Sequence, residues 1–289
     1  MKVRKAVIPA AGWGSRMLPA TKTVPKEMLP LVDRPAVQYI IEEAVSAGIE
    51  DILVITNRGK DSMSDYFDYF PELEERLKHD GKLKELEAVH RTADLANISF
   101  IRQKEARGLG HAIWRAKAFV AGEPFAVLLP DDVMRAPTPV IGQLIEAAEK
   151  YGASAIGVQQ VSDEVVSKYG VIKAQALEER VLSVEDMQEK PALAEKFSNY
   201  AILGRYVLDA KIFDILEHQE PGYGGEIQLT DALRALCRQE KMVAVDFIGK
   251  RYDTGNIRGF LEATVDFALD HPETGEWLRA FLKDKVRQL

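Results

Sequence analysis

The stretch from residue 7 to residue 30 constrains this chain more than any other. It reads V-I-P-A-A-G-W-G-S-R-M-L-P-A-T-K-T-V-P-K-E-M-L-P and follows an apolar run that begins at Val3. Gly12 and Gly14 permit positive φ angles, and the backbone N–H groups of such a turn can surround an anion. Prolines restrict the loop, which also carries the cations Arg16, Lys22 and Lys26. The stretch therefore predicts a preformed polyphosphate-binding loop after a first strand.

This loop matches neither of the two common phosphate-binding motifs. The string G-x-x-x-x-G-K-[ST] does not occur, and Met17 stands where the third glycine of G-x-G-x-x-G would be. The alternative is a strand-to-helix turn with solvated cations. The chain has 38 Lys and Arg against 45 Asp and Glu, a net charge of −7, so a cationic loop is a local exception. The same charge argues against nucleic acid or an anionic membrane as a non-specific partner.

The rest of the composition excludes several classes of site. One cysteine, Cys237, rules out an internal disulfide and fits a cytoplasmic location. No apolar run reaches the roughly 18 residues of a transmembrane helix. The five histidines lack the spacing of a zinc site, and no G-x-S-x-G elbow occurs. We therefore expect no zinc and no hydrolytic nucleophile.

The order of elements predicts the fold. Short apolar strands alternate with helical segments as far as residue 161, which favours a doubly wound, mostly parallel sheet. The helical segment 61–95 is expected to lie over the sheet, with its aromatic residues in the core or, alternatively, at a subunit contact. Three strand-like segments then follow closely and are expected to form an antiparallel insertion over one side of the sheet: 168–174, 180–191 and 198–208.

The string at residues 7–30 closely resembles the signature of the sugar-nucleotide pyrophosphorylases, which are nucleotidyltransferases. Its second half, P-K-E-M-L-P, is similar to the members that use UTP, whereas the thymidylyltransferases usually carry S-K-Q-L-L-P. Two positions depart from the family pattern, because Ser15 replaces a threonine and Trp13 a smaller residue. The resemblance implies a Rossmann-like, GT-A-like α/β fold with a mixed, mostly parallel sheet flanked by helices and an antiparallel sugar-binding insertion. It also implies a homodimer or homotetramer.

The resemblance covers most of the chain and divides one domain, residues 1–289, into parts. Residues 1–160 would bind the nucleotide, residues 161–255 the sugar phosphate, and residues 256–289 would form terminal helices. Further matching strings are R-Q-x-x-x-x-G-L-G-H-A from residue 102, P-D at 130–131, Y-G-V at 169–171, E-K-P at 189–191, S-N-x-A-x-x-G-R-Y at 198–206, E-I-Q-L-T-D-A at 226–232 and Y-D-T-G at 252–255.

The matching positions imply a set of site residues. The nucleotide-binding residues would be Ala11, Gly12, Gly14, Glu27, Gln103, Gly108 and Asp131. The sugar-phosphate-binding residues would be Gly170, Glu189, Lys190, Asn199, Gly204 and Glu226. Asp131 and Asp253 would hold Mg²⁺, which takes hard oxygen ligands.

Ordinary structural readings compete with some of these assignments. The amide of Gln103 offers a donor and an acceptor that could match a uracil edge, but a polar residue at a strand end needs no ligand. Glu189 and Lys190 could be a surface ion pair. Glu226 could simply favour a helix dipole.

The implied reaction joins UTP and glucose 1-phosphate to give UDP-glucose and diphosphate. The sugar phosphate is already an anion, so it can attack the α-phosphorus in line without a general base or a covalent intermediate. Catalysis would then consist of positioning and charge neutralisation. The resemblance assigns Arg16 to the β- and γ-phosphates, Lys26 to the α-phosphate and Lys190 to the sugar phosphate.

Three alternatives remain open at this point. The nucleotide could be dTTP, since thymine differs little from uracil. The sugar could be galactose 1-phosphate, which differs at one hydroxyl. A non-catalytic sugar-nucleotide sensor is the most distant alternative, and the presence of both Lys26 and Asp131 argues against it.

Overall fold

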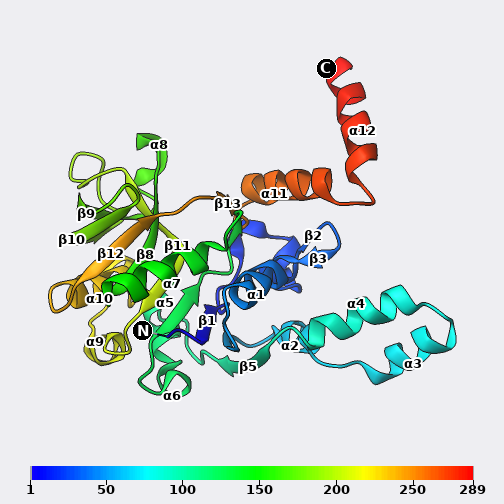
Figure 1. Ribbon diagram of the computed structural model, residues 1–289, viewed down its shortest axis with the longest axis horizontal. Coiled ribbons are helices and arrows are strands. Elements are labelled where there is room, and N and C mark those ends of the chain that lie inside the picture. The colour runs from blue at the N-terminus through cyan, green and yellow to red at the C-terminus, as the bar shows by residue number, and fades with distance from the viewer. Residues whose placement is uncertain (1, 289) are drawn as a thin grey trace.

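A nine-stranded sheet forms the centre of the molecule, with helices packed on both faces (Figure 1). The computed structural model describes residues 2–288. The strand order is β5-β4-β1-β6-β11-β8-β12-β10-β9. The strands are β1 (Lys5–Pro9), β4 (Asp51–Thr56), β5 (Asn97–Arg102), β6 (Phe125–Leu128), β8 (Ser154–Gln160), β9 (Gly170–Ala176), β10 (Val181–Glu189), β11 (Tyr200–Leu208) and β12 (Met242–Asp246).

The first half of the sheet is parallel and sets the position of the site. Strand β1 lies between β4 and β6 and runs parallel to both, and β5 is parallel to β4. β1, β4 and β6 are buried along almost their whole length, which explains their continuous apolar sequences. The carboxyl ends of parallel strands meet at one edge of a sheet, where ligands bind in such folds. The loops that follow these strands therefore gather at one place.

The expected antiparallel insertion is part of this same sheet and does not lie over it. Strand β11 sits in the middle, antiparallel to both β6 and β8, and only its first residue is not buried. A strand buried on both faces must be central, which is why the expected placement over one side of the sheet was wrong. β8, β12 and β9 run in the direction of β1, so only β10 and β11 oppose it. The predicted mixed, mostly parallel sheet is confirmed.

Helices cover the two faces of the sheet with separate apolar cores. One face packs against α1 (Ala36–Ser46), α7 (Val140–Tyr151) and α11 (Ile257–Asp270). The other packs against α5 (Leu109–Trp114), α6 (Lys117–Val120), α9 (Ile212–His218) and α10 (Leu229–Cys237). Further short elements are β2 (Pro30–Leu31), β3 (Arg34–Pro35), β7 (Asp132–Arg135), α8 (Asp163–Val166), η4 (Tyr223–Gly225) and β13 (Lys250–Asp253).

Two helical segments project away from the sheet (Figure 1). The first contains α2 (Asp61–Phe67), α3 (Pro71–His79) and α4 (Leu83–Ala93), and neither α3 nor α4 contains a buried residue. Tyr69 and Phe70 are more than half exposed, so the expectation that this segment covers the sheet with its aromatic residues in the core is wrong for them. The second is α12 (Gly275–Arg287). Within residues 2–288, no helix is long and apolar enough to cross a membrane.

Candidate active site

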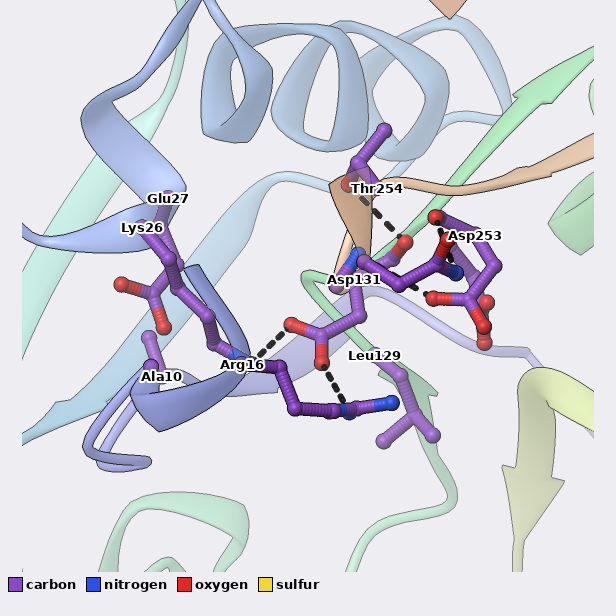
Figure 2. Close-up of polar contacts among 12 residues, drawn as sticks. Ala10, Arg16, Lys26, Glu27, Leu129, Asp131, Asp253 and Thr254 are labelled. Carbon is purple, nitrogen blue, oxygen red and sulfur yellow. Dashed lines mark hydrogen bonds and ion pairs between the residues drawn. The ribbon is translucent and has the colours of Figure 1, made fainter. Parts of the chain in front are cut away.

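Two cations from the first loop meet an aspartate from the loop after β6 (Figure 2). Lys26 Nζ forms an ion pair with Asp131 Oδ1, and the Arg16 guanidinium lies 3.6 Å from Asp131 Oδ2. The Lys26 side chain is 14% exposed, whereas that of Arg16 is 64% exposed. The carbonyl oxygen of Asp131 accepts hydrogen bonds from Thr254 N at 2.7 Å and Thr254 Oγ1 at 2.9 Å. The structure thus brings the predicted residues Arg16, Lys26 and Asp131 together.

Asp253 joins this group from the opposite direction. Asp253 is the last residue of β13, which pairs antiparallel with β7, and the nearby Gly255 has no side chain to separate the two carboxylates. A Cβ atom on Gly255 would lie 2.7 Å from Asp131 Oδ2 and 3.1 Å from Asp253 Oδ1. Two converging carboxylates suit Mg²⁺, which commonly binds one or two carboxylates together with substrate phosphates. Among the described residues, no group of three or more His, Cys, Asp or Glu side chains could hold a metal.

The glycine-containing loop is compact and carries hydrogen bonds within itself. It folds into three short 3₁₀ turns: η1 (Ser15–Met17), η2 (Ala20–Lys22) and η3 (Lys26–Met28). Gly14 has a φ of +67°, and its carbonyl oxygen accepts a hydrogen bond of 2.8 Å from Thr21 Oγ1. A Cβ atom on Gly12 would lie 3.7 Å from Lys26 Nζ. The turn therefore packs directly against the lysine that contacts Asp131.

Glu27 takes part in a buried ion pair that sequence reasoning missed. Only 1% of Glu27 is exposed, and Lys60 Nζ lies 2.9 and 2.7 Å from its two carboxylate oxygens. The same Nζ donates to the carbonyl oxygen of Ala10 at 2.6 Å. Burial raises the pKa of Glu27 and lowers that of Lys60, while their pairing favours the charged form of both. The position of Lys60, just after β4 beside β1, was the available signal.

A cavity of about 390 Å³ lies beside this group. It is lined by most of the predicted nucleotide-binding residues and by Trp13, whereas the side chain of Glu27 is turned away toward Lys60. The nucleotide-binding residues found there are Ala11, Gly12, Gln103, Gly108 and Asp131, and they are joined by Lys26, predicted as catalytic, and Glu226, assigned to the sugar. A larger cavity of about 620 Å³ lies between α1 and the α2–α4 segment. We place the site in the smaller cavity, because Lys26 and Asp131 line it and Arg16 contacts Asp131.

Gln103 is buried in the wall of this cavity, and its amide orientation is fixed. Its Nε2 donates to the carbonyl oxygen of Gly108 at 3.2 Å and lies 2.9 Å from Nδ1 of His111. Burial lowers the pKa of His111, with smaller effects from Arg107 and Arg115, so a neutral imidazole can accept this hydrogen bond. Both amide hydrogens are therefore engaged within the protein, which leaves Oε1 as the group that can accept from a base. The earlier interpretation, in which one amide meets both uracil groups, does not fit this arrangement.

Gly108 is required by packing against another segment. Its φ is +104°, and a Cβ atom there would lie 2.7 Å from the carbonyl oxygen of Ile227 and 2.8 Å from Cβ of Glu226. Backbone hydrogen bonds of 2.8 Å join Ile227 to Arg107 and to Gly110. This docking explains why Glu226, assigned by resemblance to the sugar, lines the same cavity as Gln103.

Three residues assigned to the sugar phosphate lie together at the β9–β10 pair. Glu189 is opposite Gly170, and Glu189 Oε2 accepts a hydrogen bond of 2.6 Å from Thr230 Oγ1. Lys190 Nζ lies 3.3 Å from Glu189 Oε1 and 5.1 Å from the centre of the Tyr223 ring. Lys190 has a φ of +44°, which is strained for a residue with a side chain. Strain of this kind concentrates at functional positions.

The other two residues assigned to the sugar, Asn199 and Gly204, have their contacts within the protein. The Asn199 amide nitrogen donates to the Val161 carbonyl oxygen at 2.9 Å and to Asp163, and its oxygen accepts from Lys196. Gly204 has a φ of +60°, and a Cβ atom there would lie 2.1 Å from Asp132 Oδ2. In this structure both residues support the fold around the site.

Arg251, which sequence reasoning also missed, connects the two halves. Its guanidinium forms hydrogen bonds of 2.7 Å to Asp132 Oδ1 and 3.0 Å to the Tyr169 hydroxyl, and it lies 3.9 Å from Asp253 Oδ2. The carbonyl oxygen of Tyr169 accepts a 3.1 Å hydrogen bond from the backbone of Lys190. Asp132 is therefore a buried partner of Arg251 and not a third acid of the site.

This arrangement can hold one polyphosphate against a second phosphate and neutralise both. Lysine and arginine contact phosphate oxygens, and the carboxylate pair can hold a divalent cation between them. Chemistry of this kind needs positioning and charge more than a nucleophilic side chain. The fold and the site together define a nucleotidyltransferase.

Comparison with known proteins agrees with this class. The model of the nucleotidyl transferase family matches residues 5–269, so the chain belongs to that family. It is 52% identical over 282 residues to the UTP–glucose-1-phosphate uridylyltransferase of Bacillus subtilis (strain 168), covering 98% of this chain and 97% of that protein.

Two solved structures have the same fold. A UTP-bound UDP-glucose pyrophosphorylase from Acinetobacter baumannii is 36% identical with a TM-score of 0.90, covering 97% of this chain and 99% of that one. A UDP-glucose pyrophosphorylase complexed with UDP-glucose is 42% identical with a TM-score of 0.84, covering 92% of this chain and 98% of that one.

Proposed function

We propose that this protein transfers a uridylyl group from UTP to glucose 1-phosphate, forming UDP-glucose and releasing diphosphate. The observation that carries the proposal is the contact of Arg16 and Lys26 with Asp131 at the border of the cavity that contains Gln103. Relatives that share about half of this sequence over nearly its whole length have that activity in their names. The names of these relatives also support UTP, and not dTTP, as the nucleotide.

The charged residues divide the work between the two substrates. Lys26 is the less exposed cation and would neutralise the α-phosphate in the transition state. Arg16 is more exposed and would hold the β- and γ-phosphates and the departing diphosphate. Lys190, with Glu189 beside it, would hold the phosphate of the sugar. We assign residues 1–160 to the nucleotide and residues 161–255 to the sugar phosphate, within one domain.

The carboxylates of Asp131 and Asp253 would hold Mg²⁺. Their convergence on Gly255 and their hard oxygen donors fit this ion. When bound, the ion supplies positive charge between the phosphates and helps to orient them. Lys26 pairs with one oxygen of Asp131, so the lysine neutralises that acid. Phosphate oxygens can then replace Asp131 as the partner of Lys26.

The proposed assembly is a cytoplasmic homodimer or homotetramer. The projecting helix α12 carries stacked Trp277 and Phe281 side chains with ring centres 5.3 Å apart, and Trp277 is 62% exposed. Tyr69 and Phe70 are exposed on the other projecting segment. Burying these aromatic surfaces against another copy would remove them from water. Light scattering of the wild type and of a Trp277→Ser/Phe281→Ser variant tests this, and a monomeric wild type contradicts it.

Diphosphate release tests the function directly. The purified protein is incubated with Mg²⁺ and glucose 1-phosphate, and UTP, dTTP, ATP, CTP and GTP are compared. We expect rapid release with UTP that EDTA abolishes. A preference for dTTP would keep the chemistry and overturn the uridine assignment. A parallel series with galactose 1-phosphate tests the sugar. No release with any triphosphate or either sugar phosphate would favour a non-catalytic sensor.

A further inference from the structure

The buried pair of Lys60 and Glu27 lies next to the site and has no part in the proposed chemistry. A buried charge must be matched by a partner and by hydrogen bonds. Lys60 meets this condition with three acceptors, the two oxygens of Glu27 and the carbonyl oxygen of Ala10. Asn57, three residues earlier, donates to the carbonyl oxygen of Ala11 at 2.5 Å. The loop after β4 therefore holds the backbone at the end of β1.

Glu27 and Lys26 are neighbours on the short turn η3, and their side chains reach different partners. Figure 2 shows the Lys26 side chain reaching Asp131 while the Glu27 carboxylate turns toward Ala10. Fixing Glu27 therefore fixes the backbone from which Lys26 extends. Lys60 also binds the carbonyl oxygen of Ala10, and the next residue, Ala11, lines the nucleotide cavity. One ammonium group thus fixes both the first nucleotide-binding residue and the catalytic lysine.

We propose that Lys60 is a positioning residue, which acts through Glu27 and Ala10 to hold Lys26 in line with the α-phosphate. Glu27 then serves this link and does not contact the uridine. The family resemblance had implied such a contact. This inference rests on the proposed uridylyl transfer. Displacing a reacting group by about 1 Å can lower a rate by about two decades. The link should therefore affect kcat more than the affinity for either substrate.

The main test compares Lys60→Met with Lys60→Met/Glu27→Leu. The single variant leaves a buried carboxylate unpaired, so both the melting temperature and kcat should fall, the latter by about 10²-fold if Lys26 shifts by about 1 Å. The double variant removes both charges, so its melting temperature should recover while kcat stays low and the KM for glucose 1-phosphate stays within twofold of wild type. Recovery of kcat together with the melting temperature would show that the pair only stabilises the fold, which overturns the proposal.

The chain offers a matched control at the other end of β1. Lys5 Nζ contacts Glu123 Oε1 at 2.6 Å and the carbonyl oxygen of Val120 at 3.2 Å, so it also bridges a glutamate and a backbone group. Lys5→Met should leave kcat unchanged. An equal loss of kcat in Lys5→Met and Lys60→Met would mean that any such bridge on β1 affects turnover, against a specific role for Lys60.

Two further measurements keep the inference testable if the double variant does not fold. A cavity of about 140 Å³ beside Lys60 leaves room for a larger cation, so Lys60→Arg should retain most of the wild-type kcat. A loss equal to that of Lys60→Met contradicts the proposal. The ratio of kcat/KM for UTP over dUTP should be the same in Glu27→Gln as in wild type. A collapse of that ratio would show that Glu27 contacts the ribose.

The proposed function can fail separately from this inference. Wild-type diphosphate release with UTP tests the function, and the Lys60 variants are scored only against wild type. Calorimetry of UTP binding gives a second readout that needs no turnover, and Lys60→Met should weaken binding by less than tenfold. A complete loss of UTP binding in folded Lys60→Met would place Lys60 in the binding site and overturn its positioning role.

Discussion

Replacing Lys26 by alanine should lower kcat much more than replacing Arg16. Both cations contact Asp131, but the Lys26 side chain is 14% exposed and that of Arg16 is 64% exposed. Two unit charges about 4 Å apart interact by about 4 kcal/mol at an effective dielectric constant of 20, and by about 1 kcal/mol in water. The first value suits the half-buried lysine, and the second suits the exposed arginine.

These energies convert into rates. A loss of about 3–4 kcal/mol of transition-state stabilisation lowers kcat by about 10²–10³-fold, and a loss of about 1 kcal/mol lowers it by about fivefold. The assay is diphosphate release at saturating UTP and glucose 1-phosphate, with melting temperatures to confirm folding. Lys22→Ala is the matched control, because Lys22 is an exposed lysine of the same loop, at the end of η2.

Three results would refute the reasoning. Equal losses of kcat in Lys22→Ala and Lys26→Ala would show that the net charge of the loop matters and that the contact of Lys26 with Asp131 does not. Equal losses in Arg16→Ala and Lys26→Ala would show that exposure does not set the electrostatic contribution. An unchanged kcat in Lys26→Ala, with a raised KM for UTP, would move Lys26 from transition-state stabilisation to ground-state binding.

Three further predictions follow from other contacts. Lys190→Ala should raise the KM for glucose 1-phosphate and leave kcat nearly unchanged, which steady-state kinetics with varied sugar phosphate measures; an equal change in both constants contradicts it. Gly204→Ala should lower the melting temperature strongly, because the new Cβ would lie 2.1 Å from Asp132 Oδ2 at a φ of +60°, and an unchanged melting temperature in thermal denaturation would contradict it. The pKa of His111 is lowered from 6.5 in the folded state, chiefly by burial, so the unfolded chain takes up a proton first on acidification. Stability should therefore fall as the pH drops below 6.5, and chemical denaturation at several pH values should show a weaker dependence in His111→Gln.

The sequence predicted the parts of the site that follow directly from strand ends. Apolar runs ending at Pro9 and Leu128 are buried strands, and the loops after them must meet at one edge of a parallel sheet. The meeting of Lys26 with Asp131 follows from that rule. The central position of β11 could not be predicted in this way, because strand-like patterns show that a strand exists and do not show which strands it pairs with.

The ion pairs that support the site were not predictable from local pattern. Lys60 and Glu27 are 33 residues apart, and Arg251 and Asp132 are 119 residues apart. Each is an ordinary charged residue in its own segment, and only the fold shows that it is buried with a partner. The predicted placement of the α3–α4 segment was wrong for a related reason. Its helices were recognised, but periodicity alone does not say whether a helix packs on the sheet or projects from it.

The supporting pairs explain how an acidic protein keeps a cationic site ready for two anions. Lys26 is matched by Asp131, Lys60 by Glu27, and Arg251 by Asp132 with Asp253 nearby. Each cation is thus partly desolvated and held by a partner, which is the preorganised arrangement that electrostatic stabilisation of a transition state requires. Of the three, only the Lys26–Asp131 pair borders the cavity, so it is the pair that substrate phosphates can exchange with. The other two pairs do not line the cavity, and they join segments that are distant in the sequence and surround it.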